Sequence, residues 1–244
     1  MIAGPCSLEK LETVVDIAMQ CQVWAEKHNF DYVFKGSFDK ANRTSIVSKR
    51  GVGIERGIEM LKAVKKLGIK VTTDIHEPWQ ADELKGVLDI VQIPAYLCRQ
   101  TDLLVAAGKM GCTVNIKKGQ FIDGKNMIHA INKVKSTGNN DIMLTERGSM
   151  FGMGDLVVDF RQVVDMKELG VPVIMDCTHS TQRPNSGSTT DGQPKYAIHI
   201  AKLAKAVDVD GYFFEVHENP SAAWSDGSNM IKLSEFENVL KQIA

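Results

Sequence analysis

The chain has 244 residues, of which 43% are hydrophobic, and it carries 29 basic and 30 acidic side chains. This near balance lacks the basic excess expected of a nucleic-acid-binding protein. No apolar run approaches the roughly 18 residues that would predict a membrane-spanning helix. The length suits one α/β barrel with a full apolar core. We therefore expect a single domain over residues 1–244 that binds neither nucleic acid nor membranes.

The cysteines and the first residues bear on the cellular compartment. The five cysteines are scattered and form no CxxC pair, an arrangement that argues against a disulfide framework and for a reducing environment. The segment Met1–Pro5 has the pattern of a strand rather than of a targeting peptide. Both observations predict a cytoplasmic location.

Short apolar or β-branched runs alternate with amphipathic stretches along the whole chain. The predicted strands are Ile2–Ala3, Tyr32–Phe34, Lys70–Thr73, Ile90–Ile93, Thr113–Ile116, Ile142–Leu144, Val171–Met175 and Gly211–Glu215. Helical spacing of apolar residues lies between them, for example over 54–64 and 197–207. The repeat of about 30 residues is the size of a βα unit. We predict an α/β protein with a (β/α)8 TIM barrel, with an open doubly wound sheet as the alternative.

Polar or reactive side chains follow every predicted strand, and in a parallel barrel these carboxyl ends of the strands carry the chemistry. Cationic side chains and polar companions at these ends are Lys35, Ser37, Lys40, Asn42, Arg43, Gln92, Lys117 and Arg147. Ammonium and guanidinium groups donate charge-assisted hydrogen bonds to phosphate and carboxylate. So much positive charge predicts two anionic substrates, or one with several anionic groups. Lys118 is predicted to be a surface charge.

A second set of side chains forms a candidate metal site: Cys6, His179, Glu215 and Asp226. Thiolate, imidazole and carboxylate are compatible ligands of first-row metals. Three of the four follow the first, seventh and eighth strands, which are neighbours in a closed barrel. A lone cysteine or histidine is more often a core residue, so the prediction depends on this adjacency. His217 is a competing ligand that ranks below Glu215.

Several segments resemble the 3-deoxy-D-manno-octulosonate 8-phosphate synthase family, and the resemblance covers nearly the whole chain. They include Ala3–Cys6, Phe34–Ser45 with its Lys-Ala-Asn-Arg signature, Thr73–Pro78, Asn115–Phe121 and Leu144–Gly148. The related heptulosonate 7-phosphate synthases, which use erythrose 4-phosphate, typically have Lys-Pro-Arg in place of this signature. The resemblance implies condensation of phosphoenolpyruvate with D-arabinose 5-phosphate, an early step of lipopolysaccharide sugar biosynthesis.

The resemblance also implies roles for individual residues. The carboxylate end of phosphoenolpyruvate would be held by Lys35, Ser37, Lys40, Gln92 and the Ala95 backbone, and its phosphate by Lys117 and Arg147. Arabinose 5-phosphate would contact Asn42 and Asp74. Arg43 would reach a sugar phosphate, in the family from a neighbouring subunit. Lys40 is the candidate proton donor, and His179 is a candidate for leaving-group chemistry.

Cys6, His179, Glu215 and Asp226 match the ligands of the metal-dependent branch of this family, for which Zn, Fe or Mn are the candidate ions. The metal-independent branch has asparagine in place of Cys6. The family also implies a homotetramer with sites near subunit interfaces. Three alternatives stay open: a heptulosonate 7-phosphate synthase that uses erythrose 4-phosphate, a Schiff-base aldolase with Lys117 as nucleophile, and a non-catalytic sugar-phosphate-binding barrel. The loop 183–195 lacks the Ser-Gly-Gly-x-Arg pattern common in the family, and its composition is typical of a lid.

Overall fold

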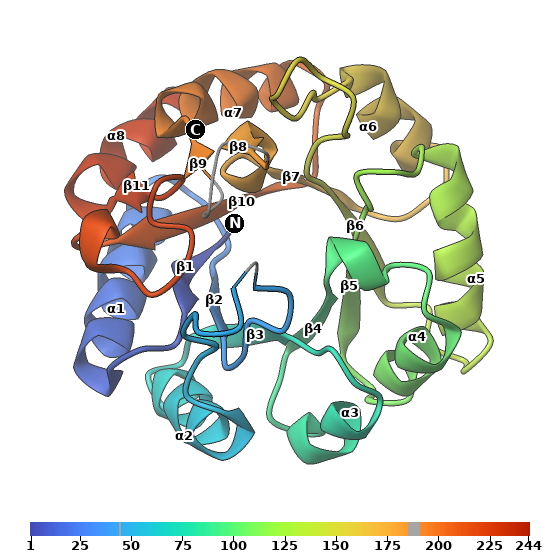
Figure 1. Ribbon diagram of the computed structural model, residues 1–244, viewed down its shortest axis with the longest axis horizontal. Coiled ribbons are helices and arrows are strands. Elements are labelled where there is room, and N and C mark those ends of the chain that lie inside the picture. The colour runs from blue at the N-terminus through green and yellow to red at the C-terminus, as the bar shows by residue number, and fades with distance from the viewer. Residues whose placement is uncertain (44, 185–190) are drawn as a thin grey trace.

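The computed structural model describes residues 1–43, 45–184 and 191–244. Eight parallel strands form a closed barrel (Figure 1). They are β1 (Ile2–Ser7), β2 (Val33–Ser37), β3 (Lys70–Asp74), β4 (Ile90–Ile93), β5 (Thr113–Lys117), β6 (Ile142–Glu146), β7 (Val173–Asp176) and β10 (Gly211–His217). They pair in chain order, and β10 pairs with β1. This closure confirms the predicted TIM barrel and excludes the open sheet.

Helices cover the outside of the barrel between successive strands (Figure 1). They are α1 (Leu11–Lys27), α2 (Ile54–Lys65), α3 (Trp79–Leu84), α4 (Thr101–Gly108), α5 (Ile128–Lys135), α6 (Phe160–Lys167), α7 (Ala197–Ala206) and α8 (Leu233–Ile243). α8 shows why they dock: it buries Phe236, Val239, Leu240 and Ile243. Their spacing of three and four residues places these side chains on one face of the helix.

Apolar side chains pack on both faces of the barrel wall. Inside the barrel lies a small cluster of Ile2, Val33, Ile90, Ile174 and Phe213. The next residues along three of these strands, Ala3, Phe34 and Val91, belong instead to the large cluster beneath the helices. Successive side chains of a strand point to opposite faces, so each strand contributes to both layers.

Most strands continue beyond their predicted apolar runs. Ser37 still pairs with Ser7, and Lys117 with Thr145. Because the backbone of these polar residues is held in the sheet ladder, their side chains start from fixed positions at the rim of the barrel.

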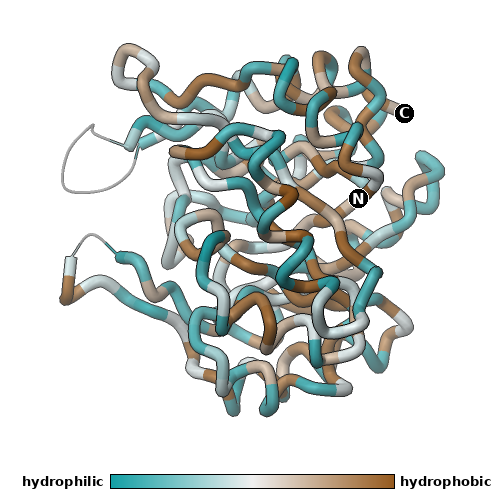
Figure 2. The backbone as a smooth tube through the Cα atoms, turned by 90° about the vertical axis from the view of Figure 1, so that its right-hand side faces the viewer, coloured by the Kyte–Doolittle hydropathy of each residue, from teal (hydrophilic) through white to brown (hydrophobic). Residues whose placement is uncertain are grey.

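Two connections project from the same end of the barrel in the side view of Figure 2. One follows β2, and the other contains the antiparallel pair β8 (Gln182–Arg183) and β9 (Asp191–Gly192). The predicted lid, 183–195, falls partly on residues 185–190, which lie outside the described residues. A short strand, β11 (Ile231–Lys232), pairs with the end of β10. Among the described residues, no helix has the length and apolarity needed to cross a membrane.

Candidate active site

A distortion of β1 positions Cys6. The register between β1 and β2 shifts between Ala3 and Cys6, and Cys6 has a φ of 64°. A β-bulge of this kind changes the direction in which a side chain points. Gly4 permits the close approach of the two strands, because a Cβ there would lie 1.9 Å from the carbonyl oxygen of Lys35. The Cys6 thiol lies 3.5 Å from Oδ2 of Asp226.

The four predicted metal ligands converge. The ligand atoms of Cys6, His179, Glu215 and Asp226 all lie within 4.8 Å of one another. Glu215 is fully buried, and neither of its carboxylate oxygens accepts a hydrogen bond from the described residues. A buried carboxylate without donors is costly unless a cation compensates it. The donor set of one sulfur, one nitrogen and two carboxylates therefore fits a first-row divalent ion.

Electrostatics and neighbouring contacts agree with this fit. Burial, and then the charge of Glu215, raise the pKa of the Cys6 thiol well above its usual range. A bound cation is the ordinary means of keeping such a thiol deprotonated. His217 lies apart from the four ligands, with its Nε2 3.8 Å from Oε2 of Glu9.

The first group of cations surrounds the hydroxyl of Ser37. Lys35 and Lys40 donate to Ser37 Oγ at 2.6 Å and 3.0 Å, and the hydroxyl donates to Oδ1 of Asp74. Ser37 thereby uses its one donor and both acceptor positions. Burial alone would raise the pKa of Asp74, but Lys35, His76 and Lys40 hold it well below its usual range. The result is a hydrogen-bonded group with two ammonium groups, in which Lys35, Ser37 and Asp74 are buried and Lys40 is half-buried.

The second group of cations lies at the ends of β5 and β6. Lys117 Nζ lies 2.5 Å from Oδ2 of Asp176 and 4.2 Å from the centre of the Phe213 ring. Arg147 donates from Nη2 to Gln182 Oε1 at 2.5 Å. Its Nη1 is buried and has no partner among the described residues. An anion that accepts from Nη1 would satisfy this donor.

The remaining predicted substrate residues occupy different surroundings. Gln92 and Ala95 are buried at the end of β4 and the start of the 3-10 turn Ala95–Leu97. Asn42 is exposed in the connection after β2. Arg43 donates to Ser225 Oγ at 2.8 Å and to the Trp224 carbonyl oxygen at 2.7 Å. Arg43 is thus brought beside the loop that carries Asp226.

The prediction for Lys118 was wrong, because this side chain is fully buried. Its Nζ donates to the carbonyl oxygens of Gly119 and Ile122 and to Ser149 Oγ. Lys118 continues the sheet by donating its backbone N–H to the Thr145 carbonyl at 2.8 Å. The outer face of a barrel strand lies beneath the surrounding connections and is not solvated.

Sequence reasoning assigned no role to Asp176, although it belongs to a polar strand end. Its Oδ2 accepts from His179 Nδ1 at 2.8 Å, in addition to the contact with Lys117. Burial would raise the pKa of Asp176, but His179 and Lys117 hold it well below its usual range. β5 and β7 flank β6 in the barrel wall, and this strand order places their ends close enough for the contact.

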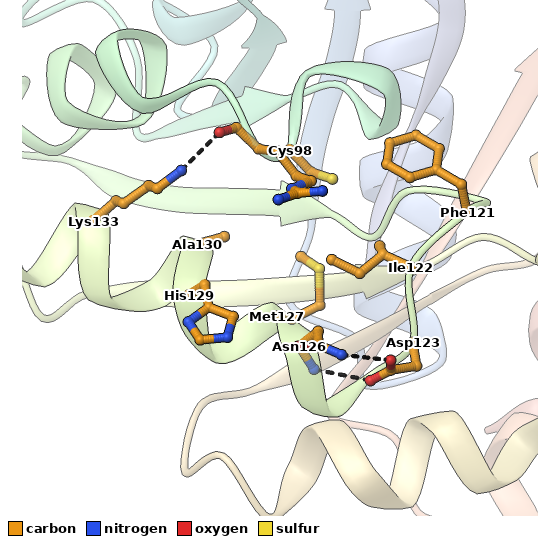
Figure 3. Close-up of a pocket in the computed structure, with 10 residues that line it drawn as sticks. Cys98, Phe121, Ile122, Asp123, Asn126, Met127, His129, Ala130 and Lys133 are labelled. Carbon is orange, nitrogen blue, oxygen red and sulfur yellow. Dashed lines mark hydrogen bonds between the residues drawn. The ribbon is translucent and has the colours of Figure 1, made fainter.

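A separate cavity of about 330 Å³ lies between the β4–α4 and β5–α5 connections (Figure 3). Its lining includes Phe121, Met127 and Ala130. Two of the polar side chains that line it have partners: Asn126 donates to the Asp123 carboxylate, and Lys133 donates to the Arg99 carbonyl. None of the strand-end cations or metal ligands lines this cavity, so it is not part of the candidate active site.

A TIM barrel whose strand ends carry two groups of cations beside four potential metal ligands is the architecture of an enzyme for anionic substrates. Residues 1–244 match the model of the DAHP synthetase I family, and the chain belongs to this family.

Relatives within the family carry a more specific name. A 2-dehydro-3-deoxyphosphooctonate aldolase of Desulfatibacillum aliphaticivorans is 50% identical, over 100% of this chain and 90% of the relative. Proteins with the same name from Cyanothece sp. and Fusobacterium nucleatum are 47% and 46% identical. These alignments cover 100% and 99% of this chain, and 90% and 87% of the relatives. The protein is therefore similar to these aldolases over its whole length.

Proposed function

We propose that this protein condenses phosphoenolpyruvate with D-arabinose 5-phosphate and water to give 3-deoxy-D-manno-octulosonate 8-phosphate and inorganic phosphate. The full-length similarity to 2-dehydro-3-deoxyphosphooctonate aldolases supports the reaction. The observation that carries the proposal is the convergence of two cation groups and four potential metal ligands at one end of one barrel.

In this proposal phosphoenolpyruvate lies between the two cation groups. Its carboxylate contacts Lys35, Ser37 and Lys40, with Gln92 and the Ala95 backbone nearby. Its phosphate accepts hydrogen bonds from Lys117 and from Nη1 of Arg147, which has no partner in the part of the chain that the structure describes. Two polyanionic substrates repel each other, and a preorganised cationic site offsets that repulsion while holding the reacting carbons in contact.

Arabinose 5-phosphate is held in the proposal by Asn42 and Asp74, with Arg43 on its phosphate. The enol carbon of phosphoenolpyruvate bonds to the aldehyde carbon, and the aldehyde oxygen takes a proton from Lys40. Burial lowers the pKa of Lys40, but the surrounding groups, Cys6 foremost, raise it above its usual value, so the ammonium is available as a donor. Water then bonds to the middle carbon and gives up one proton, which restores the Lys40 ammonium. The remaining proton of the new hydroxyl passes to the departing phosphate as the C–O bond breaks and the carbonyl forms.

Cys6, His179, Glu215 and Asp226 would hold a divalent ion such as Zn, Fe or Mn. Such an ion, when bound, polarises a carbonyl oxygen or lowers the pKa of a water molecule. Asp176 fixes the imidazole of His179 from the side opposite to the other ligands. This arrangement leaves Nε2 of His179 facing Glu215 Oε1, 3.3 Å away.

We also propose a cytoplasmic homotetramer. All five cysteines are free thiols, as expected in a reducing compartment. Four apolar side chains in loops are almost completely exposed: Ile46, Val47, Phe151 and Met153. Contact with other subunits would remove this apolar surface from water. Sedimentation velocity at several protein concentrations measures the assembly state.

Release of phosphate from phosphoenolpyruvate tests the reaction, first with arabinose 5-phosphate and then with erythrose 4-phosphate. We expect release with arabinose 5-phosphate, its loss after chelation and its return with a divalent ion. Preference for erythrose 4-phosphate would overturn the assignment of the aldose. Inactivity with both sugars, despite binding of phosphoenolpyruvate, would favour a binding protein. Borohydride trapping of substrate on Lys117 would favour a Schiff-base aldolase, although the ion pair with Asp176 disfavours a nucleophilic amine there.

A further inference from the structure

The carboxylate of Asp176 contacts both halves of the site. It lies at the end of β7 and is fully buried. A single oxygen, Oδ2, lies 2.5 Å from Nζ of Lys117 and 2.8 Å from Nδ1 of His179. One carboxylate oxygen is therefore shared between the proposed phosphate-binding lysine and a proposed metal ligand.

These contacts determine which nitrogen of the neutral His179 ring carries the proton. Lys117 Nζ lies 3.4 Å from Nδ1 and could donate to it. In that case, however, an unprotonated Nδ1 would face Oδ2 of Asp176 with lone pairs in contact. Of the two carboxylate contacts of the ring, that of Nδ1 with Asp176 is the shorter, and a bound metal ion would take the lone pair of Nε2, so the metal-loaded ring would carry its proton on Nδ1 and donate it to Asp176. The lone pair of the ring is left on Nε2, the atom that faces Glu215.

The second oxygen of Asp176 also helps to position Glu215, another proposed ligand. Oδ1 accepts from the backbone N–H of His179 at 2.9 Å and from the hydroxyl of Thr178 at 3.2 Å. The Thr178 hydroxyl in turn accepts from the backbone N–H of Glu215 at 3.2 Å. Asp176 thus helps to place both His179 and Glu215.

We propose that Asp176 is a positioning residue that couples the binding of phosphoenolpyruvate to the binding of the metal ion. The inference deepens the proposed function and rests on it. A phosphate at Lys117 competes with Asp176 for the protons of the ammonium group. The carboxylate then interacts more strongly with the Nδ1 proton of His179, which makes Nε2 a better ligand. Because linkage is reciprocal, the metal strengthens phosphoenolpyruvate binding by the same factor.

Zinc affinity, measured by competition with a chromogenic chelator, tests this coupling without aldose and without turnover. For the wild-type protein we expect phosphoenolpyruvate to tighten Zn²⁺ binding by about fivefold or more. In Asp176→Asn the Zn²⁺ affinity should fall by about 10–100-fold. The ratio of Zn²⁺ affinities with and without phosphoenolpyruvate should also fall toward one in this variant. A purely structural role of Asp176 would leave that ratio unchanged.

Glu146→Gln is the matched control, because it also converts a buried strand-end carboxylate to an amide. Glu146 accepts from the backbone N–H groups of Arg147 and Gly148 and pairs with Lys118, none of which is a proposed metal ligand, so this variant should lose stability and still retain wild-type Zn²⁺ affinity. If phosphoenolpyruvate does not change the Zn²⁺ affinity of the wild-type protein, the coupling is overturned. This outcome can be read even if Asp176→Asn does not fold. The coupling would also be overturned if Asp176→Asn folds, binds Zn²⁺ with wild-type affinity and shows the wild-type increase in that affinity with phosphoenolpyruvate. The assay of phosphate release tests the proposed reaction independently of these Zn²⁺ affinities.

Discussion

The ammonium of Lys118 and the carboxylate of Glu146 form a buried ion pair, with Nζ 3.5 Å from Oε2 and neither side chain more than 1% exposed. The other oxygen of Glu146 accepts the backbone N–H groups of Arg147 and Gly148. The pair therefore connects the end of β5 to the end of β6. Its two members are the chain neighbours of Lys117 and Arg147, the two residues that we place on the phosphate of phosphoenolpyruvate.

Lys118→Met should destabilise the fold by about 3–5 kcal/mol, because it leaves the Glu146 carboxylate buried without its cation. Burial already raises the pKa of Glu146 despite the presence of Lys118. Urea unfolding measures the change in the free energy of unfolding. The double variant with Glu146→Gln should recover part of the loss, since no uncompensated charge remains. A single variant as stable as the wild-type protein would show that the pair contributes little.

Cys6→Ser should weaken metal binding by more than about 100-fold, above the range seen when only an outer partner of a ligand is removed. The thiolate is the softest donor of the four, and serine does not replace it. Metal content after dialysis against a buffered divalent ion provides the measurement. Cys112→Ser, a half-buried thiol outside the four ligands, is the control. Equal metal content in both variants would contradict the proposed site.

Asp74 predicts a specific dependence of stability on pH. Its pKa in the folded protein lies well below its usual range, which is about 4 in the unfolded chain. The unfolded state therefore binds the proton more readily. The stabilisation by the carboxylate is present above about pH 4 and is lost as the pH falls through the folded pKa.

The free energy of unfolding of Asp74→Asn, compared with wild type at several pH values, tests this dependence. The deficit of the variant should be largest near neutral pH and should shrink below about pH 4. Asp16→Asn, an exposed change on α1, is the control. A deficit that grows toward acidic pH would have the wrong sign for this explanation.

Arg43→Met should raise the KM for arabinose 5-phosphate by about 10–100-fold, because a charge-assisted hydrogen bond contributes about 1.5–3 kcal/mol. The affinity for phosphoenolpyruvate should change much less. Steady-state kinetics with each substrate varied in turn separate the two effects. Arg56→Met, which removes an exposed arginine on α2, should leave both constants near wild type. Equal losses for the two substrates would argue against a specific contact between Arg43 and the aldose.

The sequence by itself determined the order of the elements, whereas the pairing of β10 with β1, which closes the barrel, was decided by the tertiary structure. Each strand is an apolar run, and each helix such as α8 has one apolar stripe, so local periodicity was sufficient. The same local reading located Lys35, Lys117 and Cys6, because polar side chains at strand ends stand out against apolar strands. Their chemical types, and the Lys-Ala-Asn-Arg signature, already indicated phosphorylated substrates.

Only the tertiary structure decided which of these side chains meet. The Cys6 thiol reaches Asp226 across 220 positions of sequence, through a bulge and a closed sheet that no local pattern encodes. Lys117 and Lys118 are adjacent and identical in type, yet one lies by Asp176 and the other by Glu146. Successive strand residues point to opposite faces of the wall. What each face contacts depends on the packing of neighbouring strands and loops, a property of the whole fold.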